Sequence, residues 1–190
     1  MDYFILWAGA RYPGEQTRRL EGGAWGGLKA GTFTQGQPIQ SALTPPIEID
    51  LVEDPDGEEQ MPPLWVVPAL VVRQELAQAL REAGVDNIEY FPAALIDRQS
   101  GARHLDYAVG NIVGVVDAID MQKSVLAPNS PPAIAMRFKK MVLDEQKCRG
   151  LLLFRLMHRQ SLVIVAGTLA DHLRKKNFPY LHLIPPEKFA

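Results

Sequence analysis

The side chains that most often perform chemistry are few in this sequence, and they lie far apart. Four histidines are present, and none has the His-Glu-x-x-His or cysteine–histidine spacing of a metal site. They are His104, His158, His172 and His182. Cys148 lies between Lys147 and Arg149, which can lower the pKa of a thiol, but no general base can be named for it. A structural role for Cys148 is therefore the favoured interpretation.

Other patterns that resemble catalytic or nucleotide-binding motifs are incomplete. Asp117 and Asp120 are three residues apart and can share a helix face like paired glycosidase carboxylates, but a capping role fits a short element better. The glycines in residues 22–31 lack the spacing of a phosphate-binding loop or a dinucleotide fingerprint. No serine has Gly-x-Ser-x-Gly neighbours. The sequence therefore predicts a binding protein and not an enzyme, with no cofactor and no metal.

Charge is the strongest functional signal, and it is concentrated in residues 47–60. This acidic stretch contains no Lys or Arg and holds Glu48, Asp50, Glu53, Asp54, Asp56, Glu58 and Glu59. The rest of the chain has 20 basic and 15 acidic residues, so the net charge of -2 conceals a separation of charge. Carboxylates at this density cannot be buried without partners. Because Pro45–Pro46 and Pro62–Pro63 bound the stretch, we predict an exposed loop or short edge hairpin.

The acidic stretch has two interpretations. It can be a solvated loop that aids solubility, or it can dock on a basic partner through electrostatic attraction. Nucleases and nucleic-acid-binding proteins carry the basic clefts that would attract it. The EF-hand spacing is absent, so a calcium site is the weaker interpretation. Trp65, just after the stretch, or Trp25 can supply the desolvated contact that tight binding requires.

The elements that must position these residues indicate an α+β protein. The chain has 190 residues, which is the length of one domain. Residues 1–62 are rich in Gly and Pro and predict an irregular amino-terminal region that carries the acidic loop, with Tyr3–Trp7 as a first strand. Residues 63–190 are denser in apolar residues and predict an α+β domain.

An internal repeat organises this second region. Residues 69–92 and 162–185 match at an offset of 93 residues, and each copy predicts strand, helix and strand. Gly84 and Asn177 align where the two helices should end, because both residue types adopt the left-handed conformation readily. We therefore expect two duplicated β-α-β units in a mixed sheet, with the Gly/Pro-rich amino-terminal region packed against it.

The amino terminus and the cysteine content predict a cytoplasmic protein. Residues 3–10 are apolar, but Asp2 precedes them and no Lys or Arg occurs before Arg11, unlike a signal peptide. One cysteine cannot form a disulfide within the chain, which suits a reducing compartment. The longest apolar run is far shorter than the roughly 20 residues of a membrane span.

Four blocks of the sequence resemble a known family. Residues 107–124, YAVGNIVGVVDAIDMQKS, resemble a recurrent block of bacterial polymorphic-toxin immunity proteins, immunity protein family eleven. The family's other blocks resemble Leu70 through Pro92, Val142–Lys147 followed by Leu153–Leu156, and Leu162 through Pro185. The resemblance covers about residues 64–185. Gly110 and Arg73 depart from the pattern, and the first 60 residues resemble no family that we can name.

The resemblance implies a non-catalytic inhibitor. Such inhibitors are produced together with a toxin that is delivered by interbacterial secretion, including type VI secretion. Such a protein protects the producing cell by binding the toxin tightly. Together with the acidic stretch, it predicts inhibition of a cytoplasm-acting nuclease by occlusion of its basic cleft, without direct contact to nucleic acid or membrane. Two alternatives stay open: an enzyme of unrecognised type that reverses a toxin's modification, and a regulatory protein-binding module.

Overall fold

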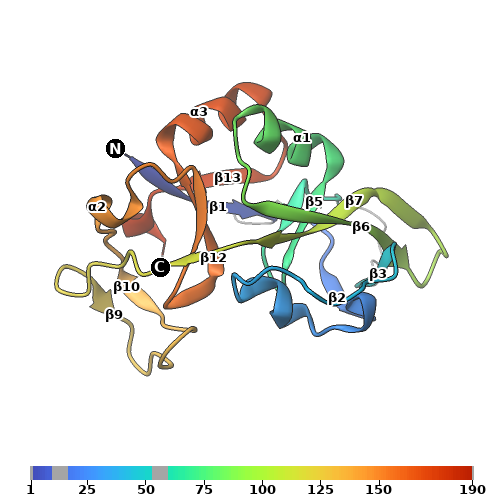
Figure 1. The fold of residues 1–190 in the computed structure, drawn as a ribbon, viewed down its shortest axis with the longest axis horizontal. Helices are drawn as coiled ribbons and strands as arrows, with labels where there is room; N and C mark the ends of the chain where they lie inside the picture. Colours follow the sequence, from blue (N-terminus) through green and yellow to red (C-terminus); the bar gives the residue numbers. More distant parts are fainter. Residues whose placement is uncertain (1, 10–16, 53–59, 190) are drawn as a thin grey trace.

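In a computed structural model, the chain forms two large β-sheets, a two-stranded ribbon and three α-helices among the described residues, 2–9, 17–52 and 60–189 (Figure 1). The strands are β1 (Tyr3–Ala8), β2 (Leu20–Gly23), β3 (Ile47–Leu51), β4 (Leu64–Trp65), β5 (Leu70–Arg73), β6 (Ile88–Asp97), β7 (Arg103–Ile112), β8 (Val115–Val116), β9 (Val125–Leu126), β10 (Phe138–Lys140), β11 (Leu153–Leu156), β12 (Arg159–Ala166) and β13 (Leu181–Ile184). The helices are α1 (Gln74–Glu82), α2 (Glu145–Cys148) and α3 (Gly167–Lys176), with short 3-10 turns at Trp25–Gly27, Ala30–Thr34 and Pro186–Lys188. None of the helices in the described ranges has the length and apolar character needed to cross a membrane.

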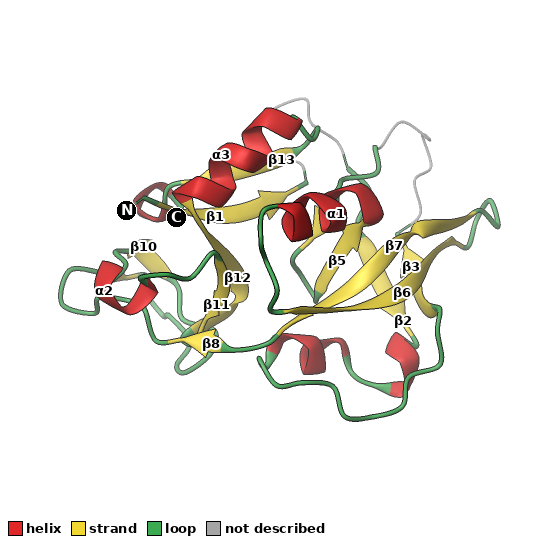
Figure 2. Cartoon of the chain, turned by 45° about the horizontal axis from the view of Figure 1, so that its top comes forward, coloured by secondary structure: helices red, strands yellow, loops and turns green. Residues whose placement is uncertain are grey.

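The two large sheets have the strand orders β2-β3-β6-β7-β5-β4 and β13-β1-β12-β11-β8. Helices α1 and α3 lie side by side and cover both sheets from the same side (Figures 1 and 2). The mixed α+β character is thus confirmed. The first strand, predicted at Tyr3–Trp7, is β1, and it lies between β12 and β13, antiparallel to both. Strands from both sides of residue 62 therefore share each large sheet.

The two segments with matching sequence have the same order of elements, β5-α1-β6 and β12-α3-β13. Their helices begin at Gln74 and Gly167, which are 93 residues apart. Both helices are followed by a left-handed residue, as predicted, because Gly84 has φ +90° and Asn177 has φ 51°. In each segment a strand from elsewhere lies between the two strands, β7 in the first and β1 in the second. The duplication of one unit remains a prediction.

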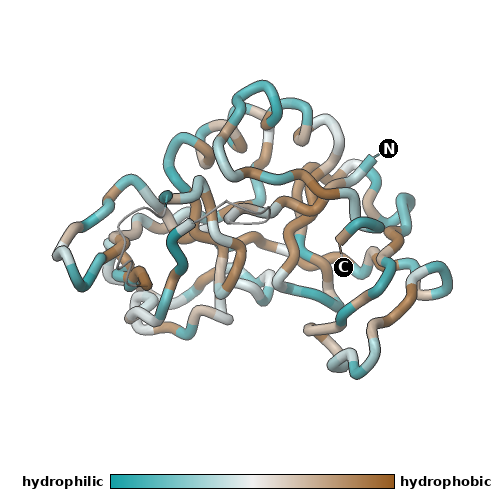
Figure 3. The backbone as a smooth tube through the Cα atoms, turned by 180° about the vertical axis from the view of Figure 1, so that it is seen from behind, coloured by the Kyte–Doolittle hydropathy of each residue, from teal (hydrophilic) through white to brown (hydrophobic). Residues whose placement is uncertain are grey.

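Three apolar clusters hold the sheets together. One lies between the two helices and both sheets, and it includes Leu6, Leu70, Leu76, Val163 and Leu169. A second lies on the other face of the five-stranded sheet, where Phe154 and Ile164 contact residues from 118–148. The third packs Trp25 and Phe33 of the amino-terminal region against the six-stranded sheet. Figure 3 shows apolar backbone segments concentrated at the centre of the molecule and polar residues over most of the outer loops.

The prediction of a loop or edge hairpin over residues 47–60 is wrong for its first part. Residues Ile47–Leu51 form β3, which lies inside the six-stranded sheet between β2 and β6. Ile47, Ile49 and Leu51 are buried and alternate with Glu48 and Asp50. This period of two is typical of a strand with one apolar face. Residues 53–59 lie outside the described part of the chain.

Candidate partner-binding surface

Glu48 and Asp50, the first two acidic residues of the acidic stretch, lie on strand β3. Its apolar side chains, Ile47, Ile49 and Leu51, point into the cluster around Phe33. Because side chains alternate along a strand, Glu48 and Asp50 point to the opposite face. Both carboxylates are partly exposed, with 46% of the Glu48 side chain and 26% of the Asp50 side chain accessible.

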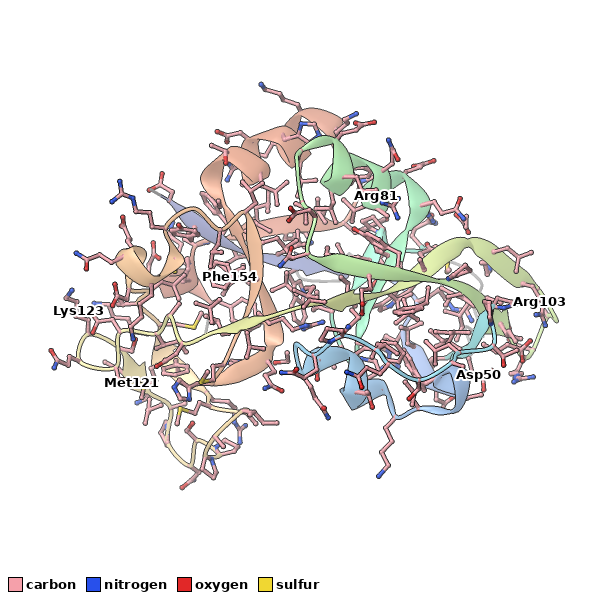
Figure 4. The ribbon with its side chains drawn as sticks, viewed as in Figure 1. Asp50, Arg81, Arg103, Met121, Lys123 and Phe154 are labelled. Atoms are coloured by element: carbon pink, nitrogen blue, oxygen red, sulfur yellow. The ribbon has the colours of Figure 1, made fainter. Side chains whose placement is uncertain are left out.

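Two arginines of the neighbouring hairpin pair with these carboxylates. Arg103 Nη2 lies 2.8 Å from Glu48 Oε1, and Arg98 Nε lies 2.7 Å from Asp50 Oδ1. Arg103 comes from the start of β7 and lies near Asp50 in Figure 4, and Arg98 comes from the turn between β6 and β7. Glu48 and Asp50, the described acidic residues of residues 47–60, are therefore largely neutralised by the chain itself.

The same hairpin turn is fixed by Asp97, the last residue of β6. Asp97 Oδ1 accepts hydrogen bonds from the backbone N–H groups of Gln99 and Ser100, and Oδ2 lies 3.3 Å from Arg18 Nη1. These bonds lower the pKa of Asp97 to about 2, and the largest effect comes from the hydrogen bond of the Ser100 backbone. Arg18 is itself buried and donates from Nε to the carbonyl oxygen of Val52. A paired carboxylate thus connects the hairpin to the end of the described acidic strand.

The five remaining candidates in the acidic stretch, Glu53, Asp54, Asp56, Glu58 and Glu59, lie outside the described residues. The structure therefore brings together only Glu48 and Asp50 from the predicted set. Arg98 and Arg103 were not predicted to have a role. The turn residues at 97–101 between two apolar runs indicate a hairpin, but no local pattern shows that it lies beside β3.

Trp65 belongs to the core of the six-stranded sheet. Its side chain is 7% exposed, and its ring centroid lies 5.4 Å from that of Tyr107. The indole Nε1 donates to the carbonyl oxygen of Arg18 at 2.9 Å. Trp25 is buried as well and packs on Phe33. Neither tryptophan is available on the surface as a contact for a partner in this conformation.

The residues that could perform chemistry are either buried or already paired with other side chains. Cys148 is fully buried, and desolvation raises the pKa of its thiol to about 11, so the flanking cations do not activate it. Asp117 lies 3.2 Å from His158 Nε2 and 3.7 Å from Lys147 Nζ. In the described ranges, no three His, Cys, Asp or Glu side chains form a group that could hold a metal ion.

Asp120 closes a turn, in keeping with the capping role. Its Oδ1 accepts hydrogen bonds from the backbone N–H groups of Gln122 and Lys123, both at 3.1 Å. Its Oδ2 pairs with Lys123 Nζ at 3.0 Å, and that hydrogen bond is the main cause that lowers the pKa of Asp120. Asp117 and Asp120 thus have different partners and do not act as a pair.

Arg155 of β11 is a buried cation that the sequence did not single out. Its side chain is inaccessible to solvent, and Nη1 donates to the carbonyl oxygen of Gln160 at 2.7 Å. Its Nε and Nη2 have no hydrogen-bond partner among the described residues, and burial lowers its pKa to about 10. The guanidinium is fully buried and lines no surface that a partner could reach.

A cavity of about 530 Å³ lies between the start of β1, the segment after β10 and the turn after β13. Asp2, Glu145 and Glu187 line it together with Lys140 and several apolar residues. These charged groups come from separate segments and make no arrangement that resembles an acid–base pair or a phosphate site. The cavity therefore adds no catalytic candidate.

Comparison with known proteins identifies the family to which the chain is related. The model of the Immunity protein family (Imm11) matches residues 11–185. This match begins about 50 residues before the resemblance that the sequence blocks indicated, so it includes the acidic stretch. No curated protein matches the chain.

Proposed function

Because the chain belongs to the Imm11 immunity protein family, we propose that it binds and neutralises a cognate secreted toxin. The observation that carries this proposal is the family match over nearly the whole chain. The partner is the toxin itself, and the chain acts by binding and not by catalysis. The buried thiol and the separately paired aspartates support a binding role, because neither offers a reactive group.

For the toxin we propose a nuclease that acts in the cytoplasm after delivery, for example by type VI secretion. A nuclease must hold phosphates in a basic cleft, and the acidic stretch has the opposite charge. Long-range attraction between such surfaces accelerates encounter, which an inhibitor needs because it must bind before the toxin acts. Occlusion of the cleft would then exclude the nucleic acid.

Within residues 47–60 we assign the attraction to the later residues. Glu48 and Asp50 are paired with Arg103 and Arg98, so their contribution at a distance is reduced. Glu53, Asp54, Asp56, Glu58 and Glu59 have no lysine or arginine among their sequence neighbours. We propose these five as the toxin contact, with Glu48 and Asp50 as its flank.

The function is tested by a pull-down from the producing bacterium with the tagged full-length chain. We expect one stoichiometric partner that has a toxin domain. Expression of that domain alone should stop growth, and co-expression of this chain should restore it. Growth arrest that persists despite a correctly folded, co-expressed chain would contradict the immunity function.

The acidic contact is tested by reversing Asp54, Asp56 and Glu58 to lysine in the full-length chain. We expect the affinity for the captured toxin domain to fall at least about ten-fold at low salt, because several attractions become repulsions. The matched control reverses three exposed acidic residues elsewhere, Glu75, Asp86 and Asp171, with the same change in net charge. Equal affinities of the two triple variants would remove the acidic stretch from the mechanism.

A further inference from the structure

The large apolar side chains that remain exposed are unevenly distributed. In the described residues, Val67 and Leu105 are the exposed examples outside residues 117–160. Within that range, six are at least 36% exposed: Met121, Val125, Leu126, Ile134, Leu151 and Met157. Single exposed apolar residues are ordinary, but their concentration in one segment indicates an interaction surface.

Backbone hydrogen bonds bring several of these residues onto neighbouring segments of the chain. Ala127 N donates to the carbonyl oxygen of Arg137 at 2.9 Å, beside the pairing of Leu126 with Phe138. Farther along the same loop, Gln160 N donates to the carbonyl oxygen of Ile134 at 3.1 Å. This bond places Ile134 next to the turn between β11 and β12, which carries Met157.

The support beneath this surface is packed. Phe138 and Met141 are buried in the cluster on the outer face of the five-stranded sheet. Ser124 Oγ accepts from the backbone N–H of Val142 and donates to its carbonyl oxygen. The exposed side chains are therefore held on a fixed scaffold, and Figure 1 shows the β9-β10 ribbon extending away from the two large sheets.

The same region carries cations without carboxylate partners. Arg137, Lys139 and Lys140 are exposed and make no ion pair with any described residue. Arg137 also lies close enough to Arg159 to lower its pKa, after the larger effect of desolvation. Two carboxylates of the region are engaged by other side chains, because Asp117 pairs with Lys147 and His158 and Asp120 pairs with Lys123. Lys140 also faces the cavity that Asp2, Glu145 and Glu187 line, so it is the least isolated of the three cations.

We propose that this apolar–basic surface (Met121, Val125, Leu126, Ile134 and Met157, with Arg137, Lys139 and Lys140) is a second contact with the toxin, which rests on the proposed function. Its complement is a surface of the toxin in which carboxylates surround apolar side chains. This surface supplies the desolvated contact that slows dissociation, which neither buried tryptophan can supply. The acidic stretch, whose described strand β3 lies at the other end of the molecule (Figure 4), governs encounter.

The composition favours a protein partner over a lipid surface. Methionine and arginine are enriched at the centres of protein interfaces, and methionine adapts to partners of irregular shape. Membrane-surface segments instead present tryptophan, tyrosine or phenylalanine at the headgroup level. No aromatic residue is among the exposed large apolar side chains of the described chain.

Two variants of the full-length chain test the proposal against the toxin domain captured above, with its active site inactivated. The apolar variant carries Leu126→Ser, Ile134→Ser and Met157→Ser, and the basic variant carries Arg137→Glu, Lys139→Glu and Lys140→Glu. We expect each to weaken binding by at least about ten-fold, the apolar variant mainly through faster dissociation. The loss in the basic variant should shrink as salt rises, because salt screens exposed charges.

Matched controls carry Val67→Ser with Leu105→Ser, or Lys29→Glu with Arg81→Glu and Lys175→Glu. These residues are exposed and lie outside the proposed surface, so affinity should stay within about two-fold. Thermal unfolding of every variant checks the fold independently of binding.

The outcomes separate this inference from the proposed function. Wild-type affinity in both test variants, with weaker binding by the acidic-stretch variant, would overturn the second contact and leave the immunity function standing. No binding by the wild-type chain would overturn both. Binding of the wild-type chain to vesicles of three parts phosphatidylcholine and one part phosphatidylserine, lost in both variants while toxin affinity is unchanged, would assign the surface to lipid and overturn the proposal.

Discussion

The two charged ends of this protein, β3 with its neighbouring hairpin and the region around β10, differ in whether their charges are paired within the chain. At one end, the described carboxylates of β3 pair with Arg98 and Arg103. At the other end, Arg137, Lys139 and Lys140 face solvent beside exposed apolar side chains. Figure 4 shows Asp50 and Arg103 at one extreme of the molecule and Met121 and Lys123 at the other.

The difference shows that a dense cluster of charge in a sequence need not be the most available charge in the fold. Residues 47–60 have the most unbalanced composition of the chain, yet the two described acids there are bound to arginines 48 and 55 residues away. The basic residues at 137–140 form a small cluster, yet they make no ion pair in the described part of the chain. Availability to a partner depends on such long-range pairs.

The largest expected change in stability comes from comparing the buried Trp65, near the acidic end, with the exposed Leu126 at the basic end. Trp65→Ala should lower the free energy of unfolding by about 3–5 kcal/mol, because it removes a buried ring and its hydrogen bond to Arg18. Leu126→Ala should change it by less than about 0.5 kcal/mol, because the side chain is 45% exposed. Urea unfolding measures both, and equal small losses would show that Trp65 is not held in the core.

A smaller effect should appear in the pH dependence of stability. Asp97 has a pKa of about 2 in the folded chain, below its ordinary value of 3.8, so its ionised form stabilises the fold. This contribution is complete above about pH 4 and is lost as the pH falls from 4 through 2. The stability difference between wild type and Asp97→Asn should therefore shrink across that window. A constant difference from pH 6 to pH 2 would contradict the assigned pKa.

The smallest expected effect is the difference in stability between removing the paired arginines and removing the lysines that make no ion pair among the described residues. Arg98→Gln with Arg103→Gln should cost about 0.2–1 kcal/mol for each lost pair, because all four side chains are partly exposed. Lys139→Gln with Lys140→Gln removes the same charge but should cost nothing measurable. Unfolding curves at low and high salt distinguish the two, since only the first pair of substitutions should lose its effect when salt is added. A cost for the lysine variant would reveal a partner for those cations.

Local periodicity explains why much of the fold could be predicted. The apolar spacing of Leu76 and Leu80, and of Leu169 and Leu173, indicated α1 and α3, and a left-handed residue follows each. The first strand was equally readable as an apolar run. These signals lie within a few residues of one another, so a single sequence contains them.

The errors arose where charge hid the pattern or where partners are distant. Ile47, Ile49 and Leu51 form the alternating face of a strand, but the acidic residues between them suggested a loop. Trp65 lies beside two prolines and the acidic stretch, which suggested exposure, whereas pairing of β4 with β5 buries it. The partners of Glu48 and Asp50 could not be predicted, because only the sheet order brings the β6-β7 hairpin beside β3.

The position of β1 has a consequence for how the protein is made. This strand leaves the ribosome before its two neighbours in the sheet, β12 and β13, whose residues lie more than 150 positions later. Such distant pairing makes folding slow and leaves unpaired strand edges in the nascent chain. Nearly all of the 190 residues must therefore be translated before the five-stranded sheet can close, and a partly synthesised copy lacks this sheet.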